Sequence, residues 1–408
     1  MKRREYSTSC RGTFVFNRSR GQGVVVEIYI DVWKESKMLD SWLSARSRTF
    51  SSSGIRKVFD LGAKLEDPIN LSIGQPDFDM PEEAHQGAIE AIKAGKSSYT
   101  PTQGSKLLID RIQADVDAKY HDSDRKAFIT SGTSGGLLLV ALAFVNPGDE
   151  VIIFDPYFVM YEALMKMIGA VPVCINTYPD FKYDVQKVAD AITPKTKMII
   201  YNSPANPTGH VATREEVEGI AKLAAEKNVI LVSDEIYRCF SNGEFYSPAQ
   251  FNSQVIVLDG FSKSHGMPGW RVGYAHGPSE MIQNMLKFQQ YTFVCAPHVG
   301  QLAALKALDA DMSSHFEAYR QKRDMLIDGL SDLYDLGNPQ GAFYMFPKAP
   351  WGTATQFVEK AITKYKLLVI PGNVFSRQDT NFRLSYASSV ETIERGIDAL
   401  RKLAKDPD

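Results

Sequence analysis

The sequence has 408 residues, 44% of them apolar and 23% charged, with a formal net charge of −2. This composition is typical of a globular protein, and the length predicts two domains or one large domain with a cap. A nearly neutral charge gives no electrostatic reason to expect a nucleic-acid or membrane-surface partner, and no apolar run is long enough to span a membrane. The cysteines and histidines show no metal-ligand spacing and no disulfide framework, which predicts reduced thiols and a cytoplasmic protein without a metal site.

The first 37 residues differ from the rest of the chain. They are basic at the start and end in one strand-like run, VVVEIYIDVW. A secretory signal is not expected because no apolar stretch follows the basic start, whereas the Arg and Ser content leaves a mitochondrial transit peptide as an alternative. We favour a third interpretation, in which Met38 is the true start and residues 1–37 are an extension that contributes little to the core.

The predicted elements after this extension fall into two groups. A short amphipathic helix at 52–59 and a helix at 104–120 precede a region where strands and helices alternate. The strand-like runs are VIIF, VPVCI, KMIIY, VILV, VIVLD and VGYAH, and helices are expected from Phe158, at 185–192 and at 213–227. Such alternation predicts an α/β fold, with a mostly parallel sheet covered by helices on both faces.

The second group contains its own small sheet. A long helical stretch from 298 to 334 is followed by FYMFP, a helix at 353–365, LLVI, FRLSYA and a final helix at 390–404. We therefore expect residues 38–70 to form an arm and part of a small domain, residues 71–305 a large domain, and residues 306–408 a small α+β domain.

The segment DGFSKSHGMPGWRVGY (259–274) carries the clearest chemical signal. Lys263 follows a strand-like run, and a lysine at the end of a buried strand is unfavourable unless it is paired or used chemically. A buried amine can form a Schiff base with a carbonyl, and Arg271 offers a guanidinium fork that matches a phosphate. Pyridoxal phosphate has both an aldehyde and a phosphate. Taken alone, the same residues could be a surface lysine and a solvated arginine.

Two other polar clusters follow strand-like runs. SPANPTG (203–209) comes after KMIIY, and SDEIY (233–237) comes after VILV. The carboxyl ends of strands in an open α/β sheet are where ligands bind. Both clusters are therefore predicted to lie at one site.

In this context the chain resembles the class I/II aminotransferases, within the fold-type I pyridoxal-phosphate-dependent enzymes. The resemblance runs from about Ile69 to the C-terminus. It rests on an ordered set of motifs: INLSIGQPDF, YTPTQG, ITSGTSGG, DPYF, SPANPTG, SDEIY, FSKSHGMPGWRVGY, GAFYMFP and NFRLSYA.

The resemblance implies roles around the cofactor ring. Lys263 holds the cofactor, and Asp234 pairs with its pyridine nitrogen. Asn206 and Tyr237 hydrogen bond its 3-oxygen, and Phe158 stacks on the ring. Each residue also has a purely structural interpretation. Asp234 could cap a helix, Asn206 could be a turn residue, and the aromatic rings could belong to the core.

The phosphate would be held at the start of the helix that begins TSGGLLLVALAF. Thr133 and Ser134 lie there, where backbone N–H groups are free and the helix dipole favours an anion. By resemblance, Ser262 and Arg271 complete this cradle. Gly260 departs from the family pattern, because many relatives have a hydroxyl three residues before the lysine.

The resemblance also implies how substrate and partner bind. Arg383, in an apolar run, is the expected bidentate partner of the substrate α-carboxylate, with Gly74 and Asn206 assisting. Tyr99 resembles the residue that reaches the cofactor phosphate of a neighbouring subunit, so a homodimer is expected.

The predicted reaction is transfer of an amino group between an L-amino acid and a 2-oxo acid by a ping-pong mechanism. A lyase or synthase on the same fold, of the C–S lyase or cyclopropane-forming type, is the alternative. A pyridoxal-phosphate-binding transcriptional regulator would need a DNA-binding domain, and residues 1–50 are too short and irregular to provide one. No second arginine is identifiable for a distal carboxylate, so the sequence does not favour aspartate over alanine, methionine or aromatic amino donors.

Overall fold

The computed structural model describes residues 14–16, 24–26, 41–50, 54–63, 65–120 and 124–407. Within the first 52 residues it contains an antiparallel strand pair, β1 (Phe14–Phe16) and β2 (Val24–Val26), and a short helix, α2 (Ala45–Thr49). Of the strand-like run VVVEIYIDVW, β2 covers the first part and the rest lies outside the described residues, as does Met38. The chain from Ser53 onward forms one compact unit.

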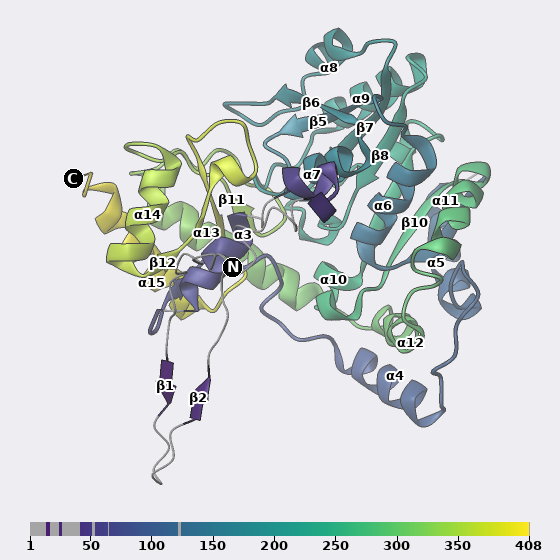
Figure 1. Ribbon diagram of the computed structural model, residues 1–408, viewed down its shortest axis with the longest axis horizontal. Helices are drawn as coiled ribbons and strands as arrows, with labels where there is room; N and C mark the ends of the chain where they lie inside the picture. The colour runs from purple at the N-terminus through teal and green to yellow at the C-terminus, as the bar shows by residue number, and fades with distance from the viewer. Residues whose placement is uncertain are drawn as a thin grey trace, which may run out of the picture. The chain divides into compact units, whose positions relative to one another are not determined.

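A seven-stranded sheet is the largest sheet of this unit (Figure 1). Its spatial order is β4 (Arg125–Thr130), β10 (Gly273–Pro278), β9 (Ile256–Gly260), β8 (Ile230–Asp234), β7 (Thr196–Asn202), β5 (Glu150–Asp155) and β6 (Val171–Asn176). β10 is antiparallel to both of its neighbours, whereas the strands from β9 to β6 pair in parallel. The predicted α/β fold with a mostly parallel sheet is confirmed.

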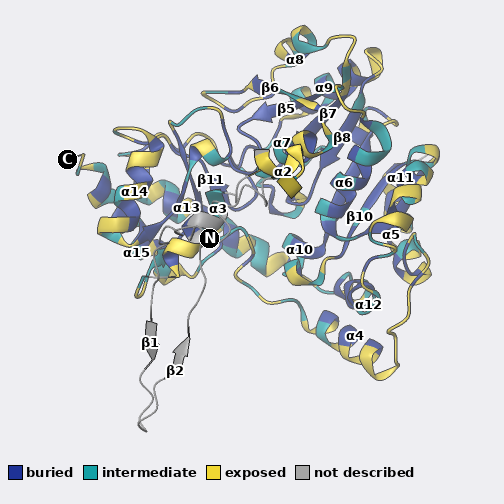
Figure 2. Cartoon of the chain, in the orientation of Figure 1, coloured by how far each residue is buried: buried dark blue, intermediate teal, exposed yellow. Residues whose placement is uncertain are grey.

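Helices cover both faces of the sheet because successive strand residues point to opposite sides. In β7, Ile199 belongs to the same apolar core as residues of α5 (Lys106–Lys119), α9 (Arg214–Glu226) and α12 (His298–Ala307). Ile200 instead belongs to the core formed with α6 (Gly132–Phe144), α7 (Val159–Ile168) and α11 (Ser279–Tyr291) on the other face. Figure 2 shows the strands as the buried layer between the helices. Two more helices, α4 (Glu82–Lys93) and α8 (Val185–Ala191), complete the first face, and α4 packs on α12.

Capping explains where several helices begin. The helix predicted at 213–227 is α9, whose N-cap Thr213 and third residue Glu216 form a reciprocal capping box. The long helical stretch predicted at 298–334 consists of two helices, α12 and α13 (Ser313–Leu330). They are separate because Asp311 turns the chain and accepts the N–H of Ser313 at 2.9 Å.

The second sheet lies in the C-terminal part, as expected. Its three antiparallel strands are β11 (Tyr344–Met345), β14 (Phe382–Ser385) and β13 (Ile370–Pro371), packed with α13, α14 (Ala354–Tyr365) and α15 (Val390–Ala404). The early segment joins this part, since β3 (Ile69–Asn70) pairs in parallel with β12 (Leu367–Leu368). Helix α3 (Gly54–Gly62) also packs there, with Gly62 against Leu368. No helix among the described residues is long and apolar enough to cross a membrane.

Candidate active site

A cavity of about 440 Å³ lies where β4, β7, β8 and β9 end and the C-terminal part begins. All but one of the side chains and turns predicted for the site line it: Gly74, Thr133, Ser134, Phe158, Asn206, Asp234, Tyr237, Ser262, Lys263, Arg271 and Arg383. Tyr99 is the exception. Tyr161, Asn202 and Tyr344 also line the cavity and were not predicted.

Lys263 lies on a short helical turn, α10 (Phe261–Ser264), directly after β9. Its Nζ donates to the carbonyl oxygen of Gly74 and lies 5.9 Å from the centre of the Phe343 ring. Burial, together with the neighbouring cations Arg383 and Arg271, lowers the pKa of Lys263 to about 8. About one tenth of the amine is therefore uncharged and nucleophilic at pH 7, far more than in an ordinary lysine.

Asp234 is the last residue of β8 and is buried. One carboxylate oxygen accepts the Tyr161 hydroxyl at 2.7 Å, and the other accepts the Ile236 N–H at 3.3 Å. Burial raises the pKa of Asp234 to about 6. No salt bridge reaches this carboxylate from any described residue, so a cationic group of a ligand would stabilise its charged form.

Arg383, on β14, is a buried cation at only 2% exposure. Its Nη1 donates to Asn206 Oδ1 at 3.1 Å and its Nη2 to the Ser72 carbonyl oxygen at 3.0 Å. The guanidinium lies between the rings of Tyr344 and Phe375, at 4.5 and 4.6 Å from their centres. Within the described chain it has no carboxylate partner, and its Nε has no hydrogen-bond acceptor. Burial lowers its pKa, and an incoming carboxylate would supply the missing anion.

Two buried phenols stand beside this arginine. The hydroxyls of Tyr237 and Tyr344 are 3.1 Å apart. Burial raises the pKa of both groups, so both are protonated at neutral pH.

The start of α6 is suited to an anion. Thr133 and Ser134 lie in its first turn, and buried Thr133 Oγ1 has no hydrogen-bond partner among the described residues. Arg271 closes the turn, donating to the carbonyl oxygens of Pro268 at 3.1 Å and Ser131 at 3.4 Å. Gly132 allows this approach, since a Cβ there would lie 2.5 Å from the Arg271 guanidinium. Free N–H groups, an unpartnered hydroxyl and a guanidinium fit a phosphate.

The structure explains the glycine at position 260. A Cβ at Gly260 would lie 2.9 Å from Gly273 Cα, closer than real Cβ atoms come to backbone. It would lie 3.4 Å from Thr133 Oγ1, so the hydroxyl of Thr133 occupies the neighbouring space. The position therefore has no room for the side chain that many relatives carry.

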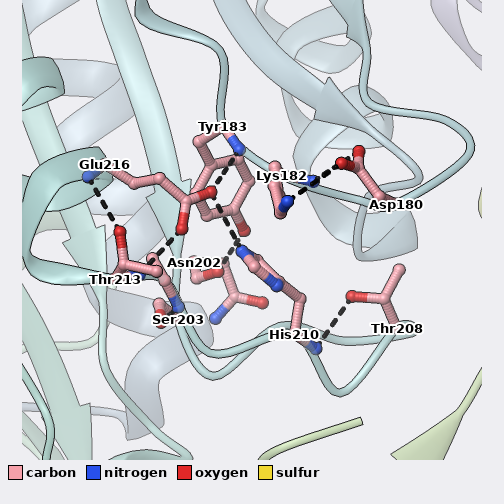
Figure 3. A network of polar contacts seen from close by, with 10 residues as sticks. Asp180, Lys182, Tyr183, Asn202, Ser203, Thr208, His210, Thr213 and Glu216 are labelled. Carbon is pink, nitrogen blue, oxygen red and sulfur yellow. Dashed lines mark hydrogen bonds and ion pairs between the residues drawn. The ribbon is translucent and has the colours of Figure 1, made fainter. Parts of the chain in front are cut away.

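A polar network holds the loop between β7 and α9 (Figure 3). Glu216 accepts the backbone N–H groups of Tyr183 and Thr213, each at 2.7 Å, and contacts His210 at 3.2 Å. The Tyr183 hydroxyl donates to the Asn202 carbonyl oxygen at 2.5 Å. The start and end of the loop are thus fixed from outside the cavity.

Asn202 connects this network to the cavity. Its Oδ1 accepts the Asn206 N–H at 3.0 Å, and its Nδ2 donates to the Asp234 carbonyl oxygen at 2.9 Å. Asn202 therefore sets the spacing between two predicted site residues. Its place directly before SPANPTG was the available sequence signal.

Tyr99 is 80% exposed and does not line the cavity of its own chain. The loop that follows it is anchored by two buried amides. Gln301 accepts the Ser105 N–H at 2.7 Å and donates to Thr100 Oγ1 at 3.1 Å, and Gln289 donates to the Thr102 carbonyl oxygen at 2.5 Å.

Comparison with known proteins identifies a family over most of the chain. The family model for aminotransferase class I and II matches residues 66–400. A probable aspartate aminotransferase of Methanocaldococcus jannaschii is 36% identical over 375 residues, covering 88% of this chain and 99% of the relative. Aromatic-amino-acid aminotransferase 2 of Thermococcus litoralis is 34% identical, with 89% and 98% covered. The solved structure of aspartate aminotransferase from Thermus thermophilus with maleate superimposes with a TM-score of 0.83 at 32% identity, covering 88% of this chain and 99% of that one.

Proposed function

The chain belongs to the class I and II aminotransferases, which depend on pyridoxal phosphate, and we propose that the cavity described above is its cofactor and substrate site. The chain is thus an enzyme that transfers an amino group between an amino acid and a 2-oxo acid. The relatives carry aminotransferase names, and none of those reported supports the lyase or synthase alternative.

One observation carries the assignment of the site. A buried arginine without an anion, a buried carboxylate without a cation, and a lysine of lowered pKa line the same cavity. Each would be unfavourable alone, and a substrate carboxylate, a protonated ring nitrogen and an aldehyde would satisfy all three. When bound, the cofactor supplies a carbonyl for covalent attachment and an electron sink for the substrate α-carbon.

Three residues of the cavity have separate roles at the cofactor ring. Lys263 attaches the cofactor through its amine and afterwards moves a proton at the substrate α-carbon, for which a pKa of about 8 is well suited. Asp234, oriented by Tyr161, keeps the ring nitrogen protonated. Phe158, at the start of α7, provides an aromatic face on the lining, and its ring is 5.6 Å from the ring of Tyr161.

The other groups hold the two charged ends of the ligands. Thr133, Ser134, Ser262 and Arg271 bind the phosphate, and the free Thr133 hydroxyl makes the contact for which Gly260 has no side chain. Arg383 binds the substrate α-carboxylate as a bidentate fork. Gly74 leaves room beside it, since a Cβ there would lie 3.2 Å from the Tyr344 hydroxyl. Tyr237 and Asn206 hydrogen bond the 3-oxygen.

The covalent role of Lys263 has a direct test. Purified protein with bound cofactor should be yellow, and borohydride should fix the cofactor on Lys263. A peptide map with the label on another lysine would overturn the assignment. Amino donor alone should release one oxo acid per site, and added oxo acid should restore the original spectrum. Steady release of ammonia or thiol without a second substrate would indicate the lyase reaction. Testing amino donors with 2-oxoglutarate and pyruvate would identify the substrate.

We further propose that the enzyme is a cytoplasmic homodimer. Large apolar side chains are exposed on α4, on the following loop, at the start of α5 and at the end of α11, including Ile92, Tyr99, Leu107 and Tyr291. A second copy of the chain would bury them and bring Tyr99 to the cofactor phosphate of its neighbour. The cysteines of the described residues are free thiols, in keeping with a reducing compartment.

A mixing experiment tests the shared site. Tyr99→Ala and Lys263→Ala proteins should each be weak or inactive. Heterodimers of the two contain one site with Lys263 from one chain and Tyr99 from the other, and that site should recover turnover. Verified heterodimers without recovery would place Tyr99 outside the neighbour's site.

A further inference from the structure

Tyr344 is a buried residue of the cavity wall that the proposed roles leave unused. It lies on β11 and is 1% exposed. Its ring covers the guanidinium of Arg383 at 4.5 Å, and its hydroxyl is 3.1 Å from that of Tyr237. One side chain thus touches both the proposed carboxylate-binding cation and one of the two proposed partners of the 3-oxygen.

We propose that Tyr344 is a positioning residue that donates its hydroxyl to Tyr237 and so relays the occupancy of Arg383 to the cofactor. This inference rests on the proposed function. It concerns a residue for which the motifs predicted no role.

The direction of the bond between the phenols follows from their surroundings. Tyr237 has a single hydroxyl proton. It can donate that proton to a ligand only if its oxygen accepts the hydrogen bond from Tyr344. Arg383 opposes the rise that burial imposes on the pKa of both phenols, but its guanidinium lies directly over the ring of Tyr344, at 4.5 Å, which makes the Tyr344 hydroxyl the more acidic donor. A phenol that receives a hydrogen bond becomes a stronger donor itself, because bonds in a chain polarise one another.

These two successive hydrogen bonds, from Tyr344 to Tyr237 and from Tyr237 to the 3-oxygen, have a measurable consequence for the bound cofactor. Donation to the 3-oxygen favours the form of the Lys263-linked chromophore that has lost its proton, because that form carries the uncompensated oxyanion. Stronger donation therefore lowers the chromophore's pKa. A carboxylate bound to Arg383 neutralises the cation beside Tyr344, so Tyr344 becomes a weaker donor to Tyr237. Tyr237 then donates less strongly to the 3-oxygen, and the chromophore's pKa rises.

The test is a pH titration of the visible absorbance of the holoenzyme, with and without a saturating carboxylate that cannot react, such as maleate. Tyr344→Phe removes only the hydroxyl. The chromophore's pKa should rise by roughly half a unit. This is the order expected when the neutral hydrogen bond from Tyr344 to Tyr237 is lost and the cofactor is affected only through Tyr237. The rise produced by maleate should shrink by at least half.

Two further variants control this experiment. Tyr334→Phe removes another buried phenol that has a bonded hydroxyl, which donates to Leu400 at 2.7 Å and does not line the cavity, so it should leave both titrations unchanged. In a Tyr237→Phe background, Tyr344→Phe should have no further effect, because its route to the cofactor is gone.

Each outcome has a defined meaning. A fall in the chromophore's pKa in Tyr344→Phe would show that Tyr237 donates to Tyr344, which overturns the proposed direction. An unchanged titration, or additive effects in the double variant, would overturn the relay. Failure of the proposed function itself is recognised separately, since wild-type protein would then show no borohydride-fixed chromophore on Lys263.

Discussion

Replacing Arg383 with methionine would separate two effects of this buried charge: its cost to the stability of the fold and its contribution to substrate binding. Methionine has a similar length, fills irregular gaps, and can pack between the rings of Tyr344 and Phe375. Removal of an unpaired buried cation relieves a desolvation penalty of several kcal/mol. It also leaves Asn206 Oδ1 and the Ser72 carbonyl oxygen without their donor, at about 1–3 kcal/mol each.

These opposing contributions nearly cancel in the protein without ligands. We expect its free energy of unfolding to stay the same or rise by up to about 2 kcal/mol, as found where function is built at the expense of stability. The effect on catalysis should be large. Loss of a buried bidentate partner of a carboxylate weakens binding by about 3–5 kcal/mol, so kcat/KM should fall roughly 10²- to 10⁴-fold for both amino acid and oxo acid.

The assay compares urea unfolding of the ligand-free protein with steady-state kinetics for both substrates. Arg401→Met is the matched control, because Arg401 makes a bidentate pair with Asp332 at 2.6 and 2.8 Å on the surface. That change should leave kcat/KM unaffected. Arg383→Lys should raise KM for both substrates, since a point charge replaces a fork. A stability loss above about 3 kcal/mol in Arg383→Met would show that the arginine is structural. A kcat/KM within tenfold of wild type would refute its role as carboxylate partner.

Three further variants or conditions test other parts of the site. Gly260→Ser should destabilise the fold by about 1–3 kcal/mol in urea unfolding, because its Cβ would press on Gly273 Cα, whereas Gly269→Ser in open space should not; equal effects would contradict the packing argument. Burial raises the pKa of Asp234 to about 6, so its contribution to ligand-free stability is present at low pH and lost as pH rises through 6. Asp234→Asn should therefore gain up to about 3 kcal/mol over wild type at pH 7.5 and about half as much at pH 5, and an equal gain at both would be inconsistent with that shift. Modification of Lys263 by an amine reagent in the ligand-free protein should have its midpoint near pH 8, and a midpoint near 10.5 would show an ordinary lysine.

Periodicity predicted most elements of this fold but not their breaks or directions. The α9 helix agreed closely with its prediction because its capping box can be read as Thr213 and Glu216. The helical stretch predicted at 298–334 did not state where α12 ends and α13 begins, although the two helices pack in different cores. A strand-like run also does not state its partner or direction, and the antiparallel placement of β10 emerges only from the three-dimensional structure.

The same contrast applies to the site. Lys263, Asp234 and Arg383 stand out in the sequence because a charge within or beside an apolar run needs a reason. Tyr161, Asn202 and Tyr344 do not, since neutral polar residues in such runs are readily accommodated in a core. Their roles come from partners distant in the chain: Tyr161 contacts Asp234, and Tyr344 contacts Tyr237 and Arg383. Sequence pattern thus identifies the groups that we propose to act on the ligand, whereas the groups that orient them become visible only through their contacts.

This division has a physical origin in how the site is held together. The charged residues gain little from the fold around them, since Arg383 lacks an anion and Asp234 lacks a cation among the described residues. They remain in place because uncharged neighbours fix them: Asn202 links the loop of Asn206 to the end of β8, and the rings around Arg383 prevent it from turning toward solvent. Changing an orienting residue should therefore disturb the site mainly through the charged group it holds. The double variants of Tyr237 and Tyr344 measure that dependence directly, and additivity between them would show that orienting and acting residues contribute independently.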